Sequence, residues 1–297
     1  MKQHVDLEAI AQTLDASDNY RVLRKLQAPQ FTNGLARPDE RLAVLVDVET
    51  TGLDPTKDEI IEIALVRFYY LSDGEITGII DVFDQLRQPS IAIPTIATEI
   101  TGITNEMVAG CQIDHKSVED IVLSADLVIA HNAFFDRRFV ERSFPVFASK
   151  PWACSMSEID WIAEGYEGTK LAYLAAEAGF FYDRHRAQND CLATIELLSR
   201  KLPKSFETGL AALLRKARRT SWRIWAEGAP FELKDVLKAR GYRWNGDNAD
   251  KPRAWYFDAS EEEKDLEISF LKDEIYRSDK QIKTTRITAF ERHSDRA

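Results

Sequence analysis

Apolar positions in the middle of the chain predict strands first and helices afterwards. The segment 42–49 is an apolar run that ends in two acids, and 60–70 is a second, largely apolar run behind a polar turn. From residue 134 onward, apolar residues recur with helical spacing. The expected elements are strands at 42–49, 60–70, 78–86 and 127–130, and helices at 94–102, from 117, and at 134–144, 155–165, 169–179 and 186–202. This order favours an α/β domain whose mixed sheet is flanked by helices.

The two ends of the chain have a different character. Apolar residues share one helical face within 6–14 and again within 20–26, which predicts a helical lead-in. Near the C-terminus we expect helices at 231–240 and 261–276 around two short strands, 242–245 and 253–257. The predicted organisation is an N-terminal extension (1–40), the α/β domain (41–203), a small basic, Trp-rich α+β accessory domain (204–280) and a polar tail (281–297).

The net charge of −10 hides an asymmetry between segments. Residues 204–256 carry twelve Lys and Arg against six acids, a net +6, so the remainder carries −16. Trp222 and Trp225 are interleaved with these cations. Cations neutralise phosphates and aromatic rings stack on unpaired bases, so this segment could hold nucleic acid. The same rings could equally form the core of a small module, and both interpretations remain open.

Nothing in the composition indicates secretion or membrane insertion. Cys111, Cys154 and Cys191 share no paired or metal-binding spacing, and the first residues are polar and helix-patterned. No apolar run approaches the roughly 20 residues that span a bilayer. We therefore expect a cytoplasmic protein in a reducing compartment, without a membrane partner.

Four acids and one histidine carry the candidate chemistry. Side chains two apart on a strand share a face, so Asp47 and Glu49 meet where apolar neighbours disfavour negative charge. A divalent cation is the usual resolution, because Mg²⁺ and Mn²⁺ prefer oxygen ligands. Asp136 and Asp190 are each expected in the first turn of a helix, where the helix dipole stabilises an anion. His185 precedes Asp190 by about one turn, so these residues can converge at strand ends and helix starts.

Three motifs together resemble a known enzyme family. They are Asp47-x-Glu49 followed by TTGLDP, HNAFFD ending at Asp136, and His185-x4-Asp190. Their order and spacing resemble the DnaQ-like, or DEDDh, 3′–5′ exonucleases, the family of the proofreading epsilon subunit of bacterial DNA polymerase III. The resemblance covers about residues 40 to 202 and implies a ribonuclease-H-like fold.

The resemblance also implies a mechanism. Two Mg²⁺ or Mn²⁺ ions, held by Asp47, Glu49, Asp136 and Asp190, would clamp the scissile phosphate, with His185 as the general base. Residues beside these motifs are candidates to contact the terminal nucleotide: Thr50, Thr51, Leu53, Thr101, Gly102, Ile103, Asn132 and Phe135.

Two further polar residues are given structural roles. Glu62 interrupts an apolar strand, so we interpret it as a buried, hydrogen-bonded acid, the alternative being a place near the metal site. His131 lacks a partner pattern like that of His185 and is assigned to positioning the loop at Asn132.

The expected function is metal-dependent 3′–5′ exonuclease activity that releases nucleoside monophosphates from the 3′ end of DNA, in proofreading or repair. One alternative is an exoribonuclease of the same fold, because the catalytic motifs do not distinguish ribose from deoxyribose. Another is an exonuclease subunit that acts mainly by binding a polymerase or another protein through its terminal extensions.

Overall fold

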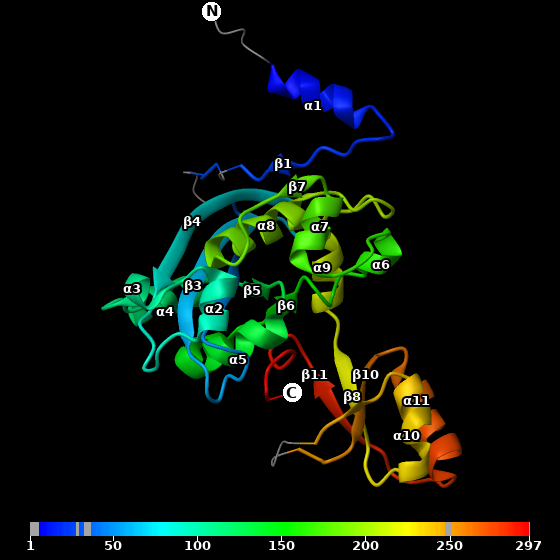
Figure 1. Cartoon of the computed structure of the whole chain (residues 1–297). Coiled ribbons are helices and arrows are strands. Elements are labelled where there is room, and N and C mark those ends of the chain that lie inside the picture. The colour runs from blue at the N-terminus through cyan, green and yellow to red at the C-terminus, as the bar shows by residue number, and fades with distance from the viewer. Residues whose placement is uncertain (1–5, 28–29, 33–36, 247–250, 297) are drawn as a thin grey trace, which may run out of the picture. The chain divides into compact units, whose positions relative to one another are not determined.

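The computed structural model describes residues 6–27, 30–32, 37–246 and 251–296 (Figure 1). The chain divides into two compact units, Met1–Leu214 and Arg215–Ala297. Each unit has its own sheet and its own apolar core. The units are therefore described one at a time.

A five-stranded mixed sheet organises the first unit, in the order β4-β3-β2-β5-β6. Strands β2, β3 and β4 pair antiparallel, whereas β5 pairs parallel with both β2 and β6. The strands are β2 (Arg41–Thr50), β3 (Ile60–Tyr70), β4 (Ile76–Leu86), β5 (Leu127–Ala130) and β6 (Trp152–Cys154). The expected mixed sheet is thus present.

Both faces of the central strands are covered by helices. Val44, Val46 and Val48 on β2 join the apolar cluster that includes residues of α4 (His115–Ser124) and α5 (Ala133–Ser143). The opposite face of β2 and β3 packs against α8 (Ala187–Ser199). Because side chains alternate along a strand, Asp47 and Glu49 lie on the face that α8 covers.

The remaining helices of the first unit are α2 (Thr95–Thr101), α3 (Asn105–Val108), η1 (Pro145–Ser149), α6 (Trp161–Glu164), α7 (Leu171–Glu177) and α9 (Gly209–Ala217). The short helix expected between Pro94 and Gly102 is confirmed as α2, with Gly102 left-handed at φ 71°.

The helix expected at 155–165 is wrong for most of its length. Only α6 forms there, capped by Asp160 rather than Ser155, because the Ser155 and Met156 N–H groups donate to the Ala130 and His131 carbonyls at the end of β5.

The N-terminal extension differs from the expectation in its second half. Helix α1 (Leu7–Asp15) forms and is capped by Asp6, as its apolar spacing predicts. The helix expected at 20–26 is wrong, since this stretch holds β1 (Arg24–Lys25), which pairs parallel with β7 (Phe180–Phe181). Hydrogen bonding to a distant strand overrides the local helical spacing here.

The boundary between the units lies at residue 214, not at 203 as the sequence suggested. Leu210, Leu213 and Leu214 of α9 are buried. Gly209 lies against the backbone of Leu197 and Leu198, so α9 begins directly on α8. The apolar face of α9 therefore ties it to the first unit.

The second unit is a four-stranded antiparallel sheet, in the order β11-β8-β10-β9, with helices. Its elements are β8 (Ser221–Ala226), η2 (Phe231–Leu233), α10 (Lys234–Ala239), β9 (Arg243–Trp244), β10 (Trp255–Ser260), α11 (Lys264–Phe270), η3 (Leu271–Tyr276) and β11 (Lys283–Ile287). The connection between the strands β9 and β10 lies partly outside the described residues, since 247–250 are not described. The strand β11 corrects the prediction of a polar tail at 281–297. A short edge strand rich in Lys, Thr and Arg carries no apolar alternation that would reveal it.

The aromatic residues of the second unit divide between core and surface. Trp225 is buried, whereas Trp244 is 52% exposed. Trp244 packs edge-on against Trp255, with 5.7 Å between ring centroids.

Within the part of the chain that the structure describes, no helix is both long and apolar enough to cross a membrane.

Candidate active site

Strand β2 and the first turn of α8 bring three carboxylates together. Oxygen atoms of Asp47, Glu49 and Asp190 all lie within 4.8 Å of one another. Asp47 and Glu49 converge because they sit two apart on β2, and Asp190 reaches them because α8 packs on that face. The predicted convergence of these three acids is therefore present in the fold.

Asp136 approaches the same place from the first turn of α5 and is buried. Its Oδ1 accepts a hydrogen bond of 3.2 Å from the backbone N–H of Val48, the residue between the two acids of β2. It lies outside the group of three defined by the 4.8 Å distance. Burial is the main cause that raises the pKa of Asp47 and Glu49, and the charge of Asp136 raises both further.

Burial and mutual repulsion make these acids hard to ionise together. Burial first, and then the neighbouring carboxylates, raise the pKa of Glu49 to about 8. Burial raises the pKa of Asp136 to about 7, although the hydrogen bond from the Val48 N–H lowers it. Burial also raises the pKa of Asp47 and of Asp190. Strongly perturbed acids gathered at one place are typical of a functional site.

The predicted base, His185, lies in the loop between β7 and α8 and is exposed. Its backbone is left-handed, with φ 61°, and its N–H donates to Oδ2 of Asp190 at 2.9 Å. The hydroxyl of Tyr182 donates to the other oxygen, Oδ1, at 2.8 Å. Asp190 is thus oriented by the loop that carries His185. Tyr182 was missed by the sequence reasoning, although it stands only three residues before the histidine.

Glu62 has the structural role predicted for it. It is fully buried on β3, directly across from Glu49. Its carboxylate accepts hydrogen bonds from Arg186 Nε at 2.8 Å and from the Ala187 N–H at 2.9 Å. Glu62 therefore fastens the start of α8 to the sheet. Asp84 on β4, which the sequence reasoning missed, adds a further acid on this side, and burial raises its pKa to about 6.

Of the three predicted substrate residues that follow the β2 acids, two use their side chains within the protein. The Thr50 hydroxyl donates to the Gly52 carbonyl. The Thr51 hydroxyl is buried and donates to Asp58 at 3.1 Å. Leu53, by contrast, is exposed. Contact of this segment with a terminal nucleotide stays a prediction, with Leu53 the most accessible of the three.

The other predicted substrate residues also differ in accessibility. The Thr101 hydroxyl is buried and donates to the Ala97 carbonyl, and Ile103 is fully buried in a small apolar cluster. Gly102 and Asn132 are exposed. Phe135 packs against the main core cluster. These assignments remain predictions, and the burial of Thr101 and Ile103 leaves Gly102 as the accessible part of its segment.

His131 is a structural residue, as the sequence suggested. Its ring nitrogens lie 2.9 Å from Ser155 Oγ and 2.9 Å from the Thr169 carbonyl. Burial lowers the pKa of the imidazole to about 4, so the ring is neutral at neutral pH. It joins the end of β5 to two loops beside Asn132, the first residue before α5.

The donor set suits a hard divalent cation. Three carboxylates converge and a fourth lies beside them, and carboxylate oxygens are the ligands that Mg²⁺ and Mn²⁺ prefer. Their pKa values are raised by burial first and by mutual repulsion second, and a bound cation would offset both effects. The residues present therefore fit the metal that the motifs imply.

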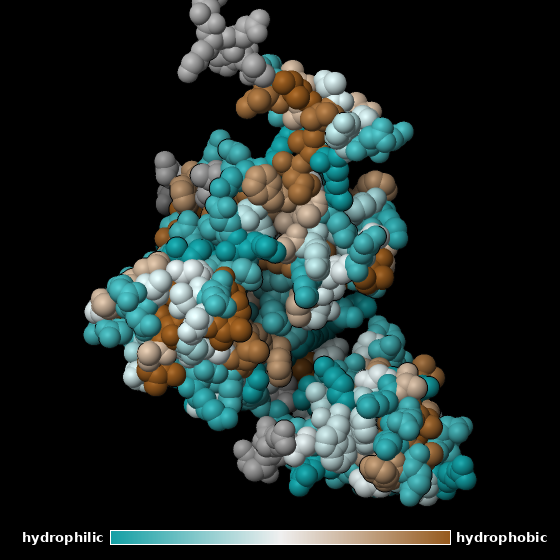
Figure 2. Space-filling view, in the orientation of Figure 1, coloured by the Kyte–Doolittle hydropathy of each residue, from teal (hydrophilic) through white to brown (hydrophobic). Residues whose placement is uncertain are grey.

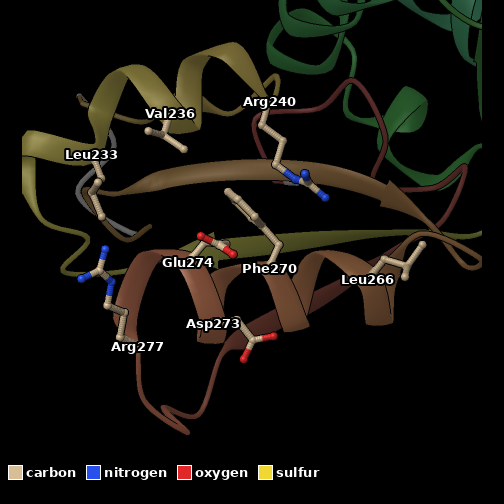
Figure 3. A pocket seen from close by; sticks show the side chains of 8 residues that line it. All are labelled: Leu233, Val236, Arg240, Leu266, Phe270, Asp273, Glu274 and Arg277. Carbon is tan, nitrogen blue, oxygen red and sulfur yellow. The ribbon is translucent and has the colours of Figure 1, made fainter.

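The second unit has a separate groove of about 560 Å³ between α10 and the α11–η3 segment (Figure 3). Phe270 extends from α11 toward Arg240, whose guanidinium lies 4.0 Å from the ring centroid. Arg240 also forms an ion pair of 2.8 Å with Glu267. The lining residues are Leu233, Val236, Arg240, Leu266, Phe270, Asp273, Glu274 and Arg277.

Comparison with known families assigns the first unit. Residues 44–198 match the family model RNase_T, described as exonuclease. The matched range contains all four acids and His185, and it ends within α8. It covers more than half of the chain.

Curated relatives match the same region at moderate identity. A PolC-type DNA polymerase III of Thermotoga petrophila is 37% identical over 124 residues, which cover 40% of this chain and 8% of that protein. The 3′–5′ exonuclease DinG of Bacillus subtilis is 33% identical over 174 residues, 54% of this chain and 18% of that protein. A DNA polymerase III subunit epsilon-like protein of Rhodobacter capsulatus is 34% identical over 186 residues, 58% of this chain and 25% of that protein. The chain thus spans a quarter or less of the length of these relatives.

A solved structure of exonuclease I is similar in fold. The similarity has a TM-score of 0.50 at 16% identity and covers 84% of this chain and 63% of that one. It supports the fold alone, and the expected ribonuclease-H-like sheet is confirmed. With the family match over residues 44–198, this chain belongs to the RNase_T exonuclease family, and the epsilon-like relative is consistent with the resemblance of its motifs to the DnaQ-like exonucleases.

Proposed function

We propose that this protein is a metal-dependent 3′–5′ exonuclease that acts on DNA and releases nucleoside monophosphates. The observation that carries the proposal is the meeting of Asp47, Glu49 and Asp190, with Asp136 beside them, on one face of the sheet. The names of the relatives, a PolC-type DNA polymerase III and the 3′–5′ exonuclease DinG, support DNA as the substrate and 3′ to 5′ as the direction.

The residues of the site have distinct roles in this proposal. Asp47, Glu49, Asp136 and Asp190 would hold two divalent cations, which activate water and stabilise the leaving 3′ oxygen when bound. His185 would act as the general base and take the proton of the attacking water. Asp190 has a second role, because it accepts the His185 N–H and so fixes the backbone that carries the base.

The test is a side-by-side digestion of 5′-labelled single-stranded DNA, duplex DNA and RNA with Mg²⁺ or Mn²⁺. We expect stepwise shortening from the 3′ end of DNA and none with Asp47→Ala. Equal degradation by Asp47→Ala would refute the enzymatic assignment. Faster degradation of RNA than of either DNA would favour the exoribonuclease alternative.

The groove of the second unit favours a second candidate function, the binding of a partner protein. Leu266 is 68% exposed at its edge, and apolar grooves with a charged rim are typical of protein interfaces. A protein segment suits it better than nucleic acid. Arg240 already pairs with Glu267, and the rim then carries two acids, Asp273 and Glu274, against Arg277. Such a rim selects an apolar segment with a net positive charge.

Size-exclusion chromatography of the protein from its native source tests this candidate. We expect a stable heteromeric peak that Leu266→Asp disperses. The matched control is Leu123→Asp, a substitution at an exposed leucine on α4 of the first unit. A monomeric peak for the wild type, or equal loss with the control, would contradict it.

A further inference from the structure

The loop that carries His185 is short and is held in an unusual conformation. It connects β7, which ends at Phe181, to α8, which begins at Ala187. Within it His185 has φ 61°, a conformation that residues other than glycine rarely adopt. Such a conformation persists only where the surroundings hold it. The contacts at the two ends of the loop therefore decide where the histidine lies.

At its downstream end the loop is fixed by the core of the exonuclease domain. Glu62 accepts hydrogen bonds from Arg186 and Ala187, and Asp190 accepts the His185 N–H. These acids all lie within residues 44–198, the range that the family shares.

At its upstream end the loop is fixed by the N-terminal extension. Strand β7 has only two residues, and among the described residues its only partner is β1. The Arg24 N–H donates to the Gly179 carbonyl at 3.1 Å, and the Leu26 N–H donates to the Phe181 carbonyl at 2.8 Å. An ion pair of 2.6 Å between Lys25 and Asp183 adds little, because both groups are more than half exposed. The main-chain pairing with β1 is thus the restraint on β7 that comes from outside the residues matching the family model, and it adds to the burial of Phe180 and to the hydrogen bond from Tyr182 to Asp190.

Strand β1 is in turn fastened to the helix that precedes it. The Arg24 guanidinium pairs with Glu8 at 2.8 Å and with Asp15 at 3.0 Å, and Asp15 also accepts the Val22 N–H at 2.9 Å. Figure 1 shows α1 above β1, and β1 beside β7. Residues 6–26 thus form one connected element that ends against the β7 strand.

We propose that the N-terminal segment 6–26 is a positioning element for the catalytic histidine, acting by the pairing of β1 with β7. This inference rests on the proposed exonuclease function of the same site. The segment lies outside residues 44–198, which match the family model. Releasing β1 would remove one restraint on the upstream end of the loop, while Tyr182 keeps its hydrogen bond to Asp190 and the acids of β2, α5 and α8 keep their places.

The experiment compares two substitutions at Leu26. Both shorten the side chain, but only one removes the main-chain hydrogen bond to β7. Leu26→Pro deletes the N–H that donates to Phe181, whereas Leu26→Ala shortens the side chain and keeps that N–H. We expect kcat of Leu26→Pro to fall about tenfold below that of Leu26→Ala with KM unchanged, because a small misplacement of a catalytic group lowers turnover strongly. A milder variant, Arg24→Ala, which frees β1 from α1, should lower kcat in the same direction.

The decisive readout is a double-mutant cycle with His185→Ala. If β1 acts through the histidine, adding Leu26→Pro to His185→Ala leaves the residual kcat unchanged. Equal kcat for Leu26→Pro and Leu26→Ala, or a further tenfold loss on the His185→Ala background, would overturn the inference. A wild-type protein without activity would instead refute the proposed function, so the two failures are distinguishable.

Discussion

The cluster of acids should cost the metal-free protein stability, and neutralising Glu49 tests this directly. The pKa of Glu49 is about 8 in the folded protein, against an ordinary value of 4.5. Because the folded-state pKa is raised, the folded protein keeps its proton between these values while the unfolded chain loses it. Stability is therefore greatest at low pH and falls as pH rises from 4.5 to 8.

The size of the effect follows from the same shift. Each pH unit of difference is worth about 1.4 kcal/mol, which sets an upper limit of about 5 kcal/mol for this group. Glu49 is only partly buried, so solvent screening and relaxation reduce the value, and we expect about 2 kcal/mol. Glu49→Gln keeps the shape and removes the charge. It should gain this stability over the wild type at pH 8 but not at pH 4.5.

The assay is urea unfolding at pH 4.5 and pH 8 in the presence of a chelator. The control is Glu119→Gln, which neutralises an exposed acid on α4 and should change neither value. Adding Mn²⁺ at pH 8 should stabilise the wild type more than Glu49→Gln, because a cation bound only to the folded state adds stability by mass action. The same pH dependence in Glu49→Gln and the wild type would refute the reasoning.

Three other predictions concern single residues. His185→Ala should lower kcat by about 10²- to 10⁴-fold while Mn²⁺ binding, measured by calorimetry, is retained; turnover at the wild-type rate would contradict its role as base. Burial lowers the pKa of His131 to about 4, so between pH 6.5 and 4 the histidine is protonated in the unfolded chain but not in the folded protein, and stability falls as pH drops through this range. His131→Gln should flatten this part of the plot of unfolding free energy against pH. An unchanged plot would contradict the prediction. Trp225→Ala should lower the free energy of unfolding by about 3 kcal/mol and Trp244→Ala by less than about 1 kcal/mol, since only Trp225 is buried; equal losses would show that exposure does not separate them.

The sequence predicted those parts of the fold whose signals are local. The strands β2 and β3 are long apolar runs, and the acids of the three motifs stand at element starts and ends that such runs define. The strands β1 and β11 were missed because two polar residues in β1, and four polar residues before Ile287 in β11, become a strand only when a distant partner strand bonds to them. The helix expected at 155–165 failed for a related reason, since the backbone N–H groups of Ser155 and Met156 bond to carbonyls at the end of the distant strand β5.

The same sheet face holds acids with opposite roles, and their partners separate them. Glu49 and Glu62 stand opposite each other on β2 and β3. Glu62 is fully buried, and its carboxylate accepts hydrogen bonds from the Arg186 guanidinium and the Ala187 N–H, so it is paired with a cation and holds the start of α8. For Glu49, burial and the neighbouring acids dominate, and its pKa rises to about 8. A carboxylate that is already paired with a guanidinium, such as Glu62, gains little from a metal ion. A carboxylate surrounded by other carboxylates, such as Glu49, is stabilised most by binding a metal ion. Glu62 holds the start of α8, and α8 places Asp190 beside Asp47 and Glu49. Of the two opposed acids, Glu62 therefore positions a residue of the cluster to which Glu49 belongs.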